Sequence, residues 1–234
     1  MTDFFKITYI FKFKEKPAKF FELNLDPKTL NIIQKTKSHP LEWTRLDYKK
    51  CSVCNLEQNQ KYCPVAVNIA DIAMDFKDIF SHEEVDVLVK VEERSYLAST
   101  TIQQALSSLA GIIMATGGCP VLEYLKPMVR FHLPFASITE TAFRMMSMYL
   151  MARYIVWKNG GRPDFDFEGL KKIYRDVSSV NRDFAERLRA ASEKDANLNA
   201  IVNLDCFANL IPLMIEDTIE EIKPYFSAYF KDKA

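Results

Sequence analysis

Three cysteines near one another in the sequence are the residues whose type and spacing most directly indicate chemistry. Cys51 and Cys54 form a C-x2-C pair, and Cys63 follows after eight mostly polar residues. A short loop between two cysteines brings both thiolates onto one ion, and zinc is commonly held by four ligands of this kind. The three cysteines therefore predict a metal-binding knuckle with zinc as the cofactor.

A tetrahedral zinc site needs a fourth donor, and Cys119 is the one we predict. The segments Cys63-Pro64-Val65 and Cys119-Pro120-Val121 repeat the order Cys-Pro-Val. Proline is favoured at the first position of a helix, so each cysteine would be an N-cap, where free N–H groups favour the thiolate and lower its pKa. The other candidates for the fourth ligand are His39, His82, His132 and Cys206. Cys206 is expected to be a small buried residue inside the last helix.

The same cysteines leave two other kinds of chemistry open. Iron–sulfur ligation is the alternative cofactor, because a cluster cysteine followed by proline also occurs in ferredoxin-type sequences, although the compact C-x2-C-x2-C run is missing. A metal- or thiol-dependent enzyme would use the Cys119 thiolate, with His132 as the acid–base group and Arg130 as the anion-binding group. The leading interpretation is a non-enzymatic binding, sensing or scaffolding module, and the sequence does not decide whether the protein is an enzyme.

The segments that must position these residues begin with strands. Residues 6–14 and 19–25 are rich in β-branched and aromatic residues and are separated by a turn-like spacer, which predicts a β-hairpin. Four valines alternate with other residues over 85–92, so this segment is expected to be a strand with one buried face. Together they predict a small N-terminal antiparallel sheet.

Helical periodicity follows from Thr100 onward. Helices are expected from there to Gly117, over 143–157, over 170–188 and over 198–230, with a bend in the last one at Pro212. The 143–157 helix begins after a capping box and is expected to be buried on most sides. In that helix Glu140 and Arg144 have the i, i+4 spacing of an ion pair. On the 170–188 helix a solvated face is expected from Arg175, Arg182, Arg187, Arg189, Asp176, Asp183 and Glu186.

These elements predict an α+β fold in which the small sheet packs on a mainly helical C-terminal half. We expect a single domain over residues 1–234, with strands and the cysteine-rich knuckle mainly in 1–98 and helices in 99–234. Residues 117–135 interrupt the helices with glycines and three prolines within an apolar run. That composition is typical of a fixed, irregular loop.

Charge and composition narrow the classes of partner and the location. The chain has 31 Lys and Arg residues and 31 Asp and Glu residues, so it has no net positive charge to attract a phosphate backbone. Nucleic acid is therefore not expected as a partner. The apolar stretches 106–115 and 145–157 are too short to span a bilayer, and no secretory signal precedes the first strand. An odd number of cysteines suits a reducing compartment, which predicts a cytoplasmic location, and any macromolecular partner is expected to be a protein.

Three motifs together carry a resemblance to a known family. They are Cys51-x2-Cys54-x8-Cys63-Pro64, Gly118-Cys119-Pro120, and the segment from Pro127 to Phe135 that reads PMVRFHLPF. In this combination the chain resembles an uncharacterised bacterial protein family over most of residues 41–155. The resemblance implies that the two cysteine segments belong together, and it implies no reaction or substrate.

Overall fold

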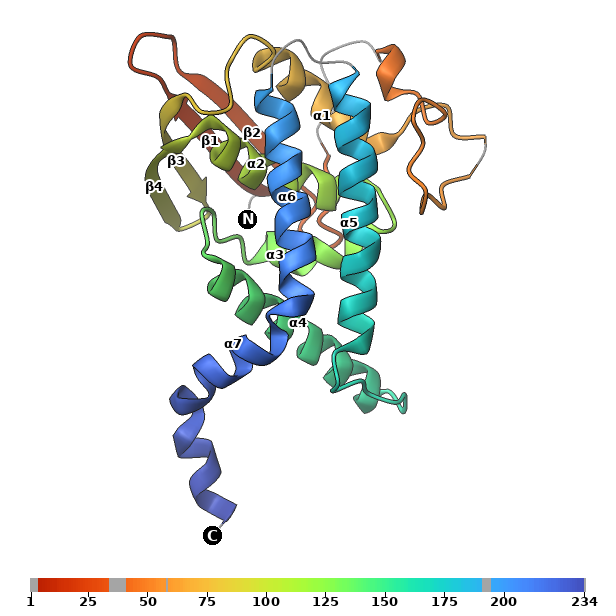
Figure 1. Ribbon diagram of the computed structural model, residues 1–234, viewed down its shortest axis with the longest axis vertical. Coiled ribbons are helices and arrows are strands. Elements are labelled where there is room, and N and C mark those ends of the chain that lie inside the picture. The colour runs from red at the N-terminus through yellow and green to blue at the C-terminus, as the bar shows by residue number, and fades with distance from the viewer. Residues whose placement is uncertain (1–3, 34–40, 58, 191–194, 234) are drawn as a thin grey trace.

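The sheet and the helices form separate parts of the molecule, as expected for an α+β fold. The computed structural model describes residues 4–33, 41–57, 59–190 and 195–233 (Figure 1). Four antiparallel strands lie in the order β2-β1-β3-β4, and they are β1 (Phe5–Lys12), β2 (Lys19–Leu25), β3 (Glu84–Val91) and β4 (Arg94–Thr101). The predicted α+β fold, with the hairpin and the 85–92 strand in one sheet, is confirmed. The fourth strand was not predicted, because its residues RSYLASTT are mostly small or polar.

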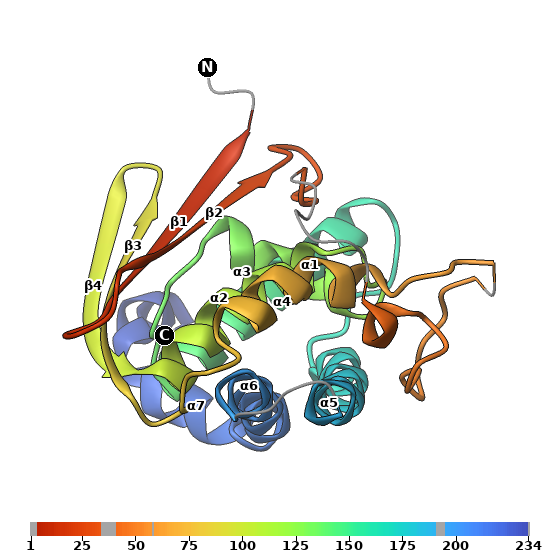
Figure 2. The ribbon, with the colours of Figure 1, turned by 90° about the horizontal axis from the view of Figure 1, so that it is seen from above.

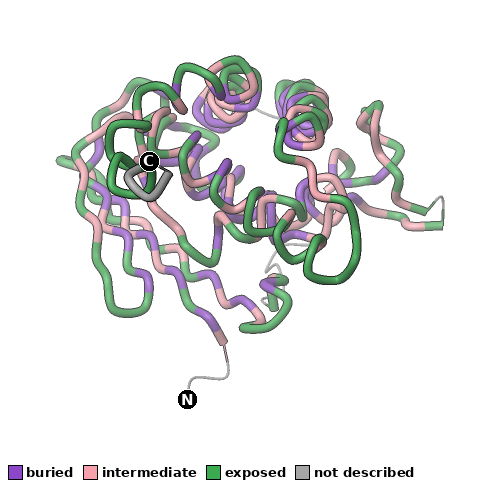
Figure 3. Tube along the Cα trace, turned by 90° about the horizontal axis from the view of Figure 1, so that it is seen from below, coloured by how far each residue is buried: buried purple, intermediate pink, exposed green. Residues whose placement is uncertain are grey.

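One face of the sheet is buried and forms part of the core. In β1 the residues Phe5, Ile7, Tyr9 and Phe11 are buried, and the four odd-numbered valines of β3 are buried beside them. In Figure 3 the strands accordingly alternate between buried and more exposed residues. The helix α2 (Ile102–Thr116) packs against this face and is buried along most of its length. It begins two residues after the expected start at Thr100, with Thr101 as N-cap and Gly117 as C-cap, and the Thr101 side chain makes no capping hydrogen bond.

The helices form two layers on this sheet. The helix α1 (Pro64–Asp75) lies beside α2, and α5 (Glu168–Arg189) and α6 (Ala196–Leu213) pack together on the opposite side of α2 (Figure 2). Short helical turns η2 (Leu122–Leu125) and α3 (Lys126–Arg130) follow α2 and lead to α4 (Ile138–Lys158). The helix α2 is therefore the central element, with the sheet on one side and α5 and α6 on the other.

The capping box predicted for α4 is present. Ser137 accepts from the N–H of Glu140 at 3.2 Å, and the Glu140 carboxylate accepts from the N–H of Ser137 at 2.7 Å. The expectation that this helix is buried on most sides is wrong, because its buried residues form one stripe that ends at Tyr149. The exposed apolar side chains of the C-terminal part include Met151, Tyr154, Ile155 and Trp157.

The C-terminal helix is broken, as its prolines suggested, but the break comes after Pro212. The helix α6 contains Pro212 and ends at Leu213, and α7 (Ile215–Ile222) and η3 (Lys223–Lys233) continue as an arm that leaves the body of the molecule (Figure 1). Within the described ranges, no single helix is long and apolar enough to cross a membrane. The bent pair Ala196–Leu213 and Ile215–Phe230 reaches the required length and apolarity only when its two parts, 69° apart, are taken together.

Candidate metal centre

The first cysteine segment is a loop that is closed at its base. It runs from η1 (Glu42–Thr44) to α1 and extends beyond the end of α5 in Figure 2. At the base Leu46 N donates to Lys61 O at 3.0 Å, and Cys63 N donates to Thr44 O at 2.8 Å. Cys54 N donates to Cys51 O at 3.0 Å, which closes the turn of the C-x2-C pair. The loop therefore holds Cys51 and Cys54 near the start of α1, where Cys63 is the N-cap.

Two side chains of α5 fix this loop from the other side. The guanidinium of Arg187, a residue that is 1% exposed, donates to four main-chain carbonyls of the loop, those of Trp43, Arg45, Leu46 and Lys49, at 2.8, 2.6, 3.5 and 3.2 Å. The carboxylate of Asp183 accepts from Ser52 N at 2.6 Å and from Ser52 Oγ at 2.8 Å. The C-x2-C turn is thus attached to α5 by charged groups that bind its main chain.

The solvated face expected for α5 is therefore wrong at Arg187, whereas Asp183 is only partly buried. Arg187 lies three and seven positions after Phe184 and Val180, which are both buried, so its spacing places it on the apolar stripe of the helix. Because arginine is charged, the residue was assigned to the solvated face from the sequence. The spacing was the available signal, and an arginine on a buried stripe indicates main-chain carbonyls or an anion in need of a donor.

The second cysteine segment lies directly against the start of α1. A Cβ atom built on Gly118 would be 3.6 Å from Cβ of Pro64, and one on Gly117 would be 3.5 Å from Cα of Val65. Gly118 has φ +88°, a left-handed conformation that glycine adopts without strain, and the chain turns there into Cys119. The glycines therefore allow the segment before Cys119 to approach the helix that Cys63 begins.

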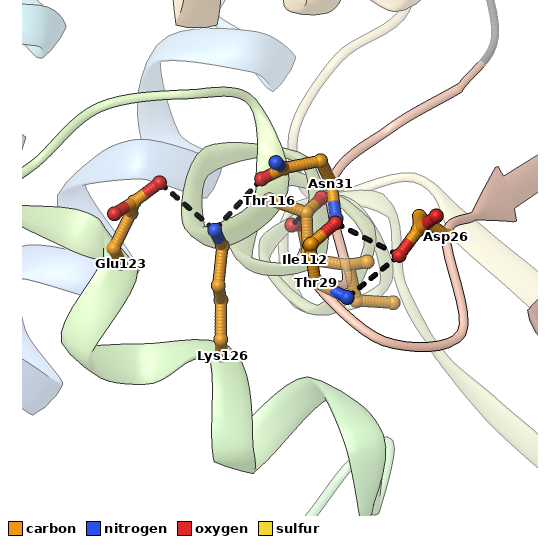
Figure 4. A network of polar contacts seen from close by, with 7 residues as sticks. All are labelled: Asp26, Thr29, Asn31, Ile112, Thr116, Glu123 and Lys126. Carbon is orange, nitrogen blue, oxygen red and sulfur yellow. Dashed lines mark hydrogen bonds and ion pairs between the residues drawn. The ribbon is translucent and has the colours of Figure 1, made fainter.

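A polar network holds the corner that carries Cys119 (Figure 4). Lys126 Nζ donates to Asn31 Oδ1 at 2.7 Å and to Glu123 Oε1 at 2.8 Å, which joins the η2–α3 corner to the turn after β2. Ile32 N donates to Thr116 O at 3.2 Å at the end of α2. These contacts connect three separate segments around the turn, so the position of Cys119 is set by the body of the fold.

Cys119 itself opens a turn, and the expected helical N-cap is not formed there. Its carbonyl accepts from Leu122 N and Glu123 N at 3.0 and 3.1 Å, and the 3-10 helix η2 begins three residues after it. The proline after the cysteine favours a helical turn, but the chain reaches only one turn of 3-10 helix before α3. Cys119 and Cys63 still share one property, the N–H groups that lie near each sulfur. The N–H groups two and three residues after each cysteine, Val65 and Ala66 or Val121 and Leu122, act on its sulfur.

The thiols of the two segments interact electrostatically. Burial raises the pKa of Cys51 to about 12, and the charges of Cys63 and Cys119 add to this increase. Burial also raises the pKa of Cys63 and of Cys119, and each is raised further by the charge of Cys54. The structure therefore brings all four predicted cysteines into one region. The expected lowering of the pKa by the nearby N–H groups is present, but burial outweighs it.

The four thiols lie in one region, but they do not surround a common point. In the part of the chain that the structure describes, no group of three or more His, Cys, Asp or Glu side chains is placed to hold a metal ion. All five cysteines are free thiols. A neutral thiol is the favoured form for each buried sulfur when no cation is present, since neighbouring thiolates would repel one another.

The other candidates for the fourth ligand lie elsewhere or outside the described residues. His82 is exposed in the turn before β3 and stacks on Phe80, with 5.7 Å between the ring centroids. Cys206 is exposed on α6, so the expectation that it is buried is wrong. His39 lies outside the described residues.

Arg130 and His132 are engaged by other partners. The Arg130 guanidinium lies 3.2 Å from the Glu92 carboxylate and 4.7 Å from the centroid of the Phe5 ring. His132 Nε2 lies 2.7 Å from the hydroxyl of Tyr9, and burial, with a contribution from the charge of Arg144, lowers the pKa of His132 to about 3. A histidine with so low a pKa stays neutral around pH 7 and is a poor proton acceptor.

Comparison with known proteins agrees with the resemblance carried by the cysteine motifs. Searches of curated proteins and of solved structures returned no match. A family model described as a domain of unknown function, DUF6901, matches residues 7–227. The match includes the sheet, the two cysteine segments and the helices through α7. The chain therefore belongs to the DUF6901 family.

Proposed function

We propose that the protein is a metal-binding module in which Cys51, Cys54, Cys63 and Cys119 hold one structural zinc ion. The observation that carries the proposal is that the four thiols lie close enough to influence one another, although α1, β3, β4 and α2 separate Cys63 from Cys119 along the chain. Zinc bound by four thiolates would tie the loop before α1 to the turn after α2. Such a tie serves binding or scaffolding by fixing the loop that extends beyond α5.

The chemistry around the thiols supports a cation at this place. A buried thiol gives up its proton when a divalent ion is available, because the ion reverses the local preference for the neutral form. Four thiolates and one zinc ion leave an excess of negative charge. The positive charge of Arg187 already acts on Cys51 and Cys63, and the N–H groups at Cys63 and Cys119 also favour thiolates. The Nε atom of Arg187 is buried and has no acceptor among the described residues, and a thiolate would provide one.

We expect the site to close by rotation of the cysteine side chains when the metal binds. Cysteine has a single side-chain torsion, and the C-x2-C turn and the N-cap position are the local geometries that zinc knuckles use. An enzyme that uses Arg130 and His132 is the second candidate function, because these side chains already contact Glu92 and Tyr9. A reducing compartment such as the cytoplasm would keep the thiols available for metal.

Metal content of anaerobically purified protein tests the proposal. We expect one zinc ion per chain after reconstitution, and a Cys119→Ser variant should bind zinc at least about tenfold more weakly, because loss of a ligand removes a charged donor. Cys206→Ser is the matched control and should keep the metal, since Cys206 is exposed on α6. Chelation should lower the stability of the unmodified protein and of the control.

Three outcomes would contradict the proposal. Absence of stoichiometric metal after reconstitution with zinc under reducing conditions would reject a metal site. Equal zinc affinity in the Cys119→Ser variant and the control would remove Cys119 from the ligand set. A brown, iron-containing sample with visible absorption would replace zinc by an iron–sulfur cluster.

A further inference from the structure

A cavity of about 400 Å³ lies among α2, α3, α4, α5 and α6. Its walls are mainly apolar, with Ile112, Leu204 and Phe207 among the lining residues. The irregular segment after α3 forms part of the wall through His132, Leu133 and Phe135. Phe135 has φ +60°, a conformation that is strained for a bulky residue and that is retained mostly where the surroundings require it. None of the four cysteines is among the lining residues, so the cavity is separate from the proposed zinc site.

Polar groups gather at one part of this cavity. Arg144 of α4, Tyr174 of α5 and His132 line it together, and the charge of Arg144 influences the pKa of both Tyr174 and His132. Ser108 lines the same cavity, and its hydroxyl and His132 Nε2 both contact the Tyr9 hydroxyl, at 2.8 and 2.7 Å. An apolar chamber with a few convergent polar groups is the usual form of a small-molecule site.

Arg144 is a cation without an anionic partner at this place. Its Nη2 atom donates to the carbonyls of Met128 and Phe131, at 3.1 and 2.5 Å. The expected ion pair with Glu140 is not formed, because the Glu140 carboxylate is occupied by the capping box. Among the described residues no carboxylate lies within ion-pair distance of Arg144, and burial lowers its pKa. A half-buried guanidinium in an apolar wall is stabilised by an anion that brings its own acceptors.

Asn181 of α5 gives a second polar group that faces the cavity. It is 3% exposed and lines the cavity, and its side chain makes no hydrogen bond to another described residue. Its amide is therefore available to a polar group of a ligand in the cavity. The cavity thus has a charged group and an unpartnered amide in a largely apolar lining.

We propose that this cavity binds a small amphipathic carboxylate, with the carboxylate on Arg144 and the apolar body between α2 and α6. The volume limits the ligand to a small molecule of about a dozen non-hydrogen atoms, if each takes roughly the 30 Å³ that a water molecule has in the liquid. A medium-chain fatty acid has this size and this distribution of charge. A cationic amphiphile would place its charge against Arg144 and is rejected by the same geometry.

Binding of decanoate to the full-length protein, measured by calorimetry, tests the proposal. We expect saturable binding of decanoate, at least tenfold weaker binding of decanol, and no binding of decyltrimethylammonium. The Arg144→Gln variant should lose at least tenfold in decanoate affinity and keep the affinity for decanol. Arg175→Gln, at an exposed position on α5, is the matched control and should bind decanoate unchanged.

The Arg144 guanidinium also donates to two main-chain carbonyls, so its replacement affects folding as well as binding. A second variant therefore tests the cavity without changing Arg144. Gly111 of α2 lines the cavity, and a Cβ atom there would meet only Leu204 Cδ2 at 3.5 Å. Gly111→Leu should fill the cavity and abolish binding of decanoate and decanol alike, with the circular dichroism spectrum unchanged. No saturable binding of decanoate, equal affinity for acid and alcohol, or undiminished binding to a folded Gly111→Leu variant would each overturn the proposal.

Discussion

Arg187 is the residue on which the cysteine loop depends most. Its guanidinium donates hydrogen bonds to four main-chain carbonyls of the loop, and it carries a positive charge beside Cys51 and Cys63. The residue therefore links folding of the loop to the electrostatics of the thiols. A neutral side chain of similar length could fill its space but could perform neither task.

We expect Arg187→Met to lower the free energy of unfolding by about 3 kcal/mol, because the buried guanidinium and its hydrogen bonds to four loop carbonyls are lost. The measurement is urea denaturation of the metal-free protein. Arg189→Met is the matched control, since Arg189 lies two residues later with an exposed side chain that pairs with Glu186, and it should change stability by less than about 0.5 kcal/mol. Equal effects of the two substitutions would show that the buried guanidinium does not hold the loop.

The thiol of Cys51 should make the metal-free protein less stable at alkaline pH. Its pKa is raised from 9.0 to about 12, so the native state holds the proton more tightly than the unfolded state. The resulting stability is complete below the unfolded pKa and is lost as the pH rises from about 9 toward 12. Between about pH 8 and pH 10 the unmodified protein should lose about 1 kcal/mol more than Cys51→Ala, as measured by urea denaturation at both pH values.

The exposed Cys206 provides the comparison for this pH effect. Cys206→Ala should lose as much stability over the same pH interval as the unmodified protein, because that side chain is not buried on folding. If Cys51→Ala and the unmodified protein show the same dependence, the Cys51 thiol is not protected from ionisation by the fold.

At the scale of elements, the turn between α2 and η2 decides where Cys119 lies. Gly118→Ala introduces a Cβ atom at φ +88° and against Pro64, whereas Gly160→Ala introduces one at φ +81° with nothing within 4 Å. Both substitutions should cost about 1 kcal/mol of stability through backbone strain. Only Gly118→Ala should also weaken zinc binding, by titration against a chelator. Equal zinc affinity in the two variants would separate this turn from the metal site.

The elements themselves follow from periodicity to a large extent. The hairpin, the valine strand and the starts of α2 and α4 were predicted because one pattern of burial repeats along each of them. The strand β4 lacks such a pattern, since its partner β3 and its place at the edge of the sheet decide its conformation. Burial of α4 was overestimated because a helix rich in apolar residues need not have a partner on every side.

The site could be predicted only in its ligand types. Spacing identified Cys51, Cys54 and Cys63, and the repeated Cys-Pro-Val order pointed to Cys119. The contributions of Arg187 and Asp183 depend on contacts more than a hundred residues away along the chain, from α5 to the loop before α1. Such contacts are set by tertiary packing, and no local pattern of residue types contains them.

In the molecule as a whole, α2 is the central helix, against which the sheet and the helices α1, α3 and α6 pack. The sheet lies on one side of it and α5 and α6 on the other, with α1 beside it, so the cysteine region and the cavity are both built on residues at or near this helix. The arm beyond α6 has a different character. Its first turn is anchored, with Ile215 and Thr218 each 1% exposed, whereas Tyr225 and Tyr229 are each 77% exposed.

The arm should therefore divide into a part that stabilises the fold and a part that does not. Removing residues 223–234 should change the free energy of unfolding by less than about 0.5 kcal/mol, because Tyr225 and Tyr229 bury little surface and Phe226 packs on Tyr229, which is removed with it. Ending the chain at Leu213 removes the buried Ile215 and should cost about 2 kcal/mol. Guanidinium denaturation of the two shortened proteins measures the difference. If removal of residues 223–234 alone lowers the free energy of unfolding strongly, the exposed aromatic residues pack against a second copy of the chain. The size of that decrease would then depend on protein concentration.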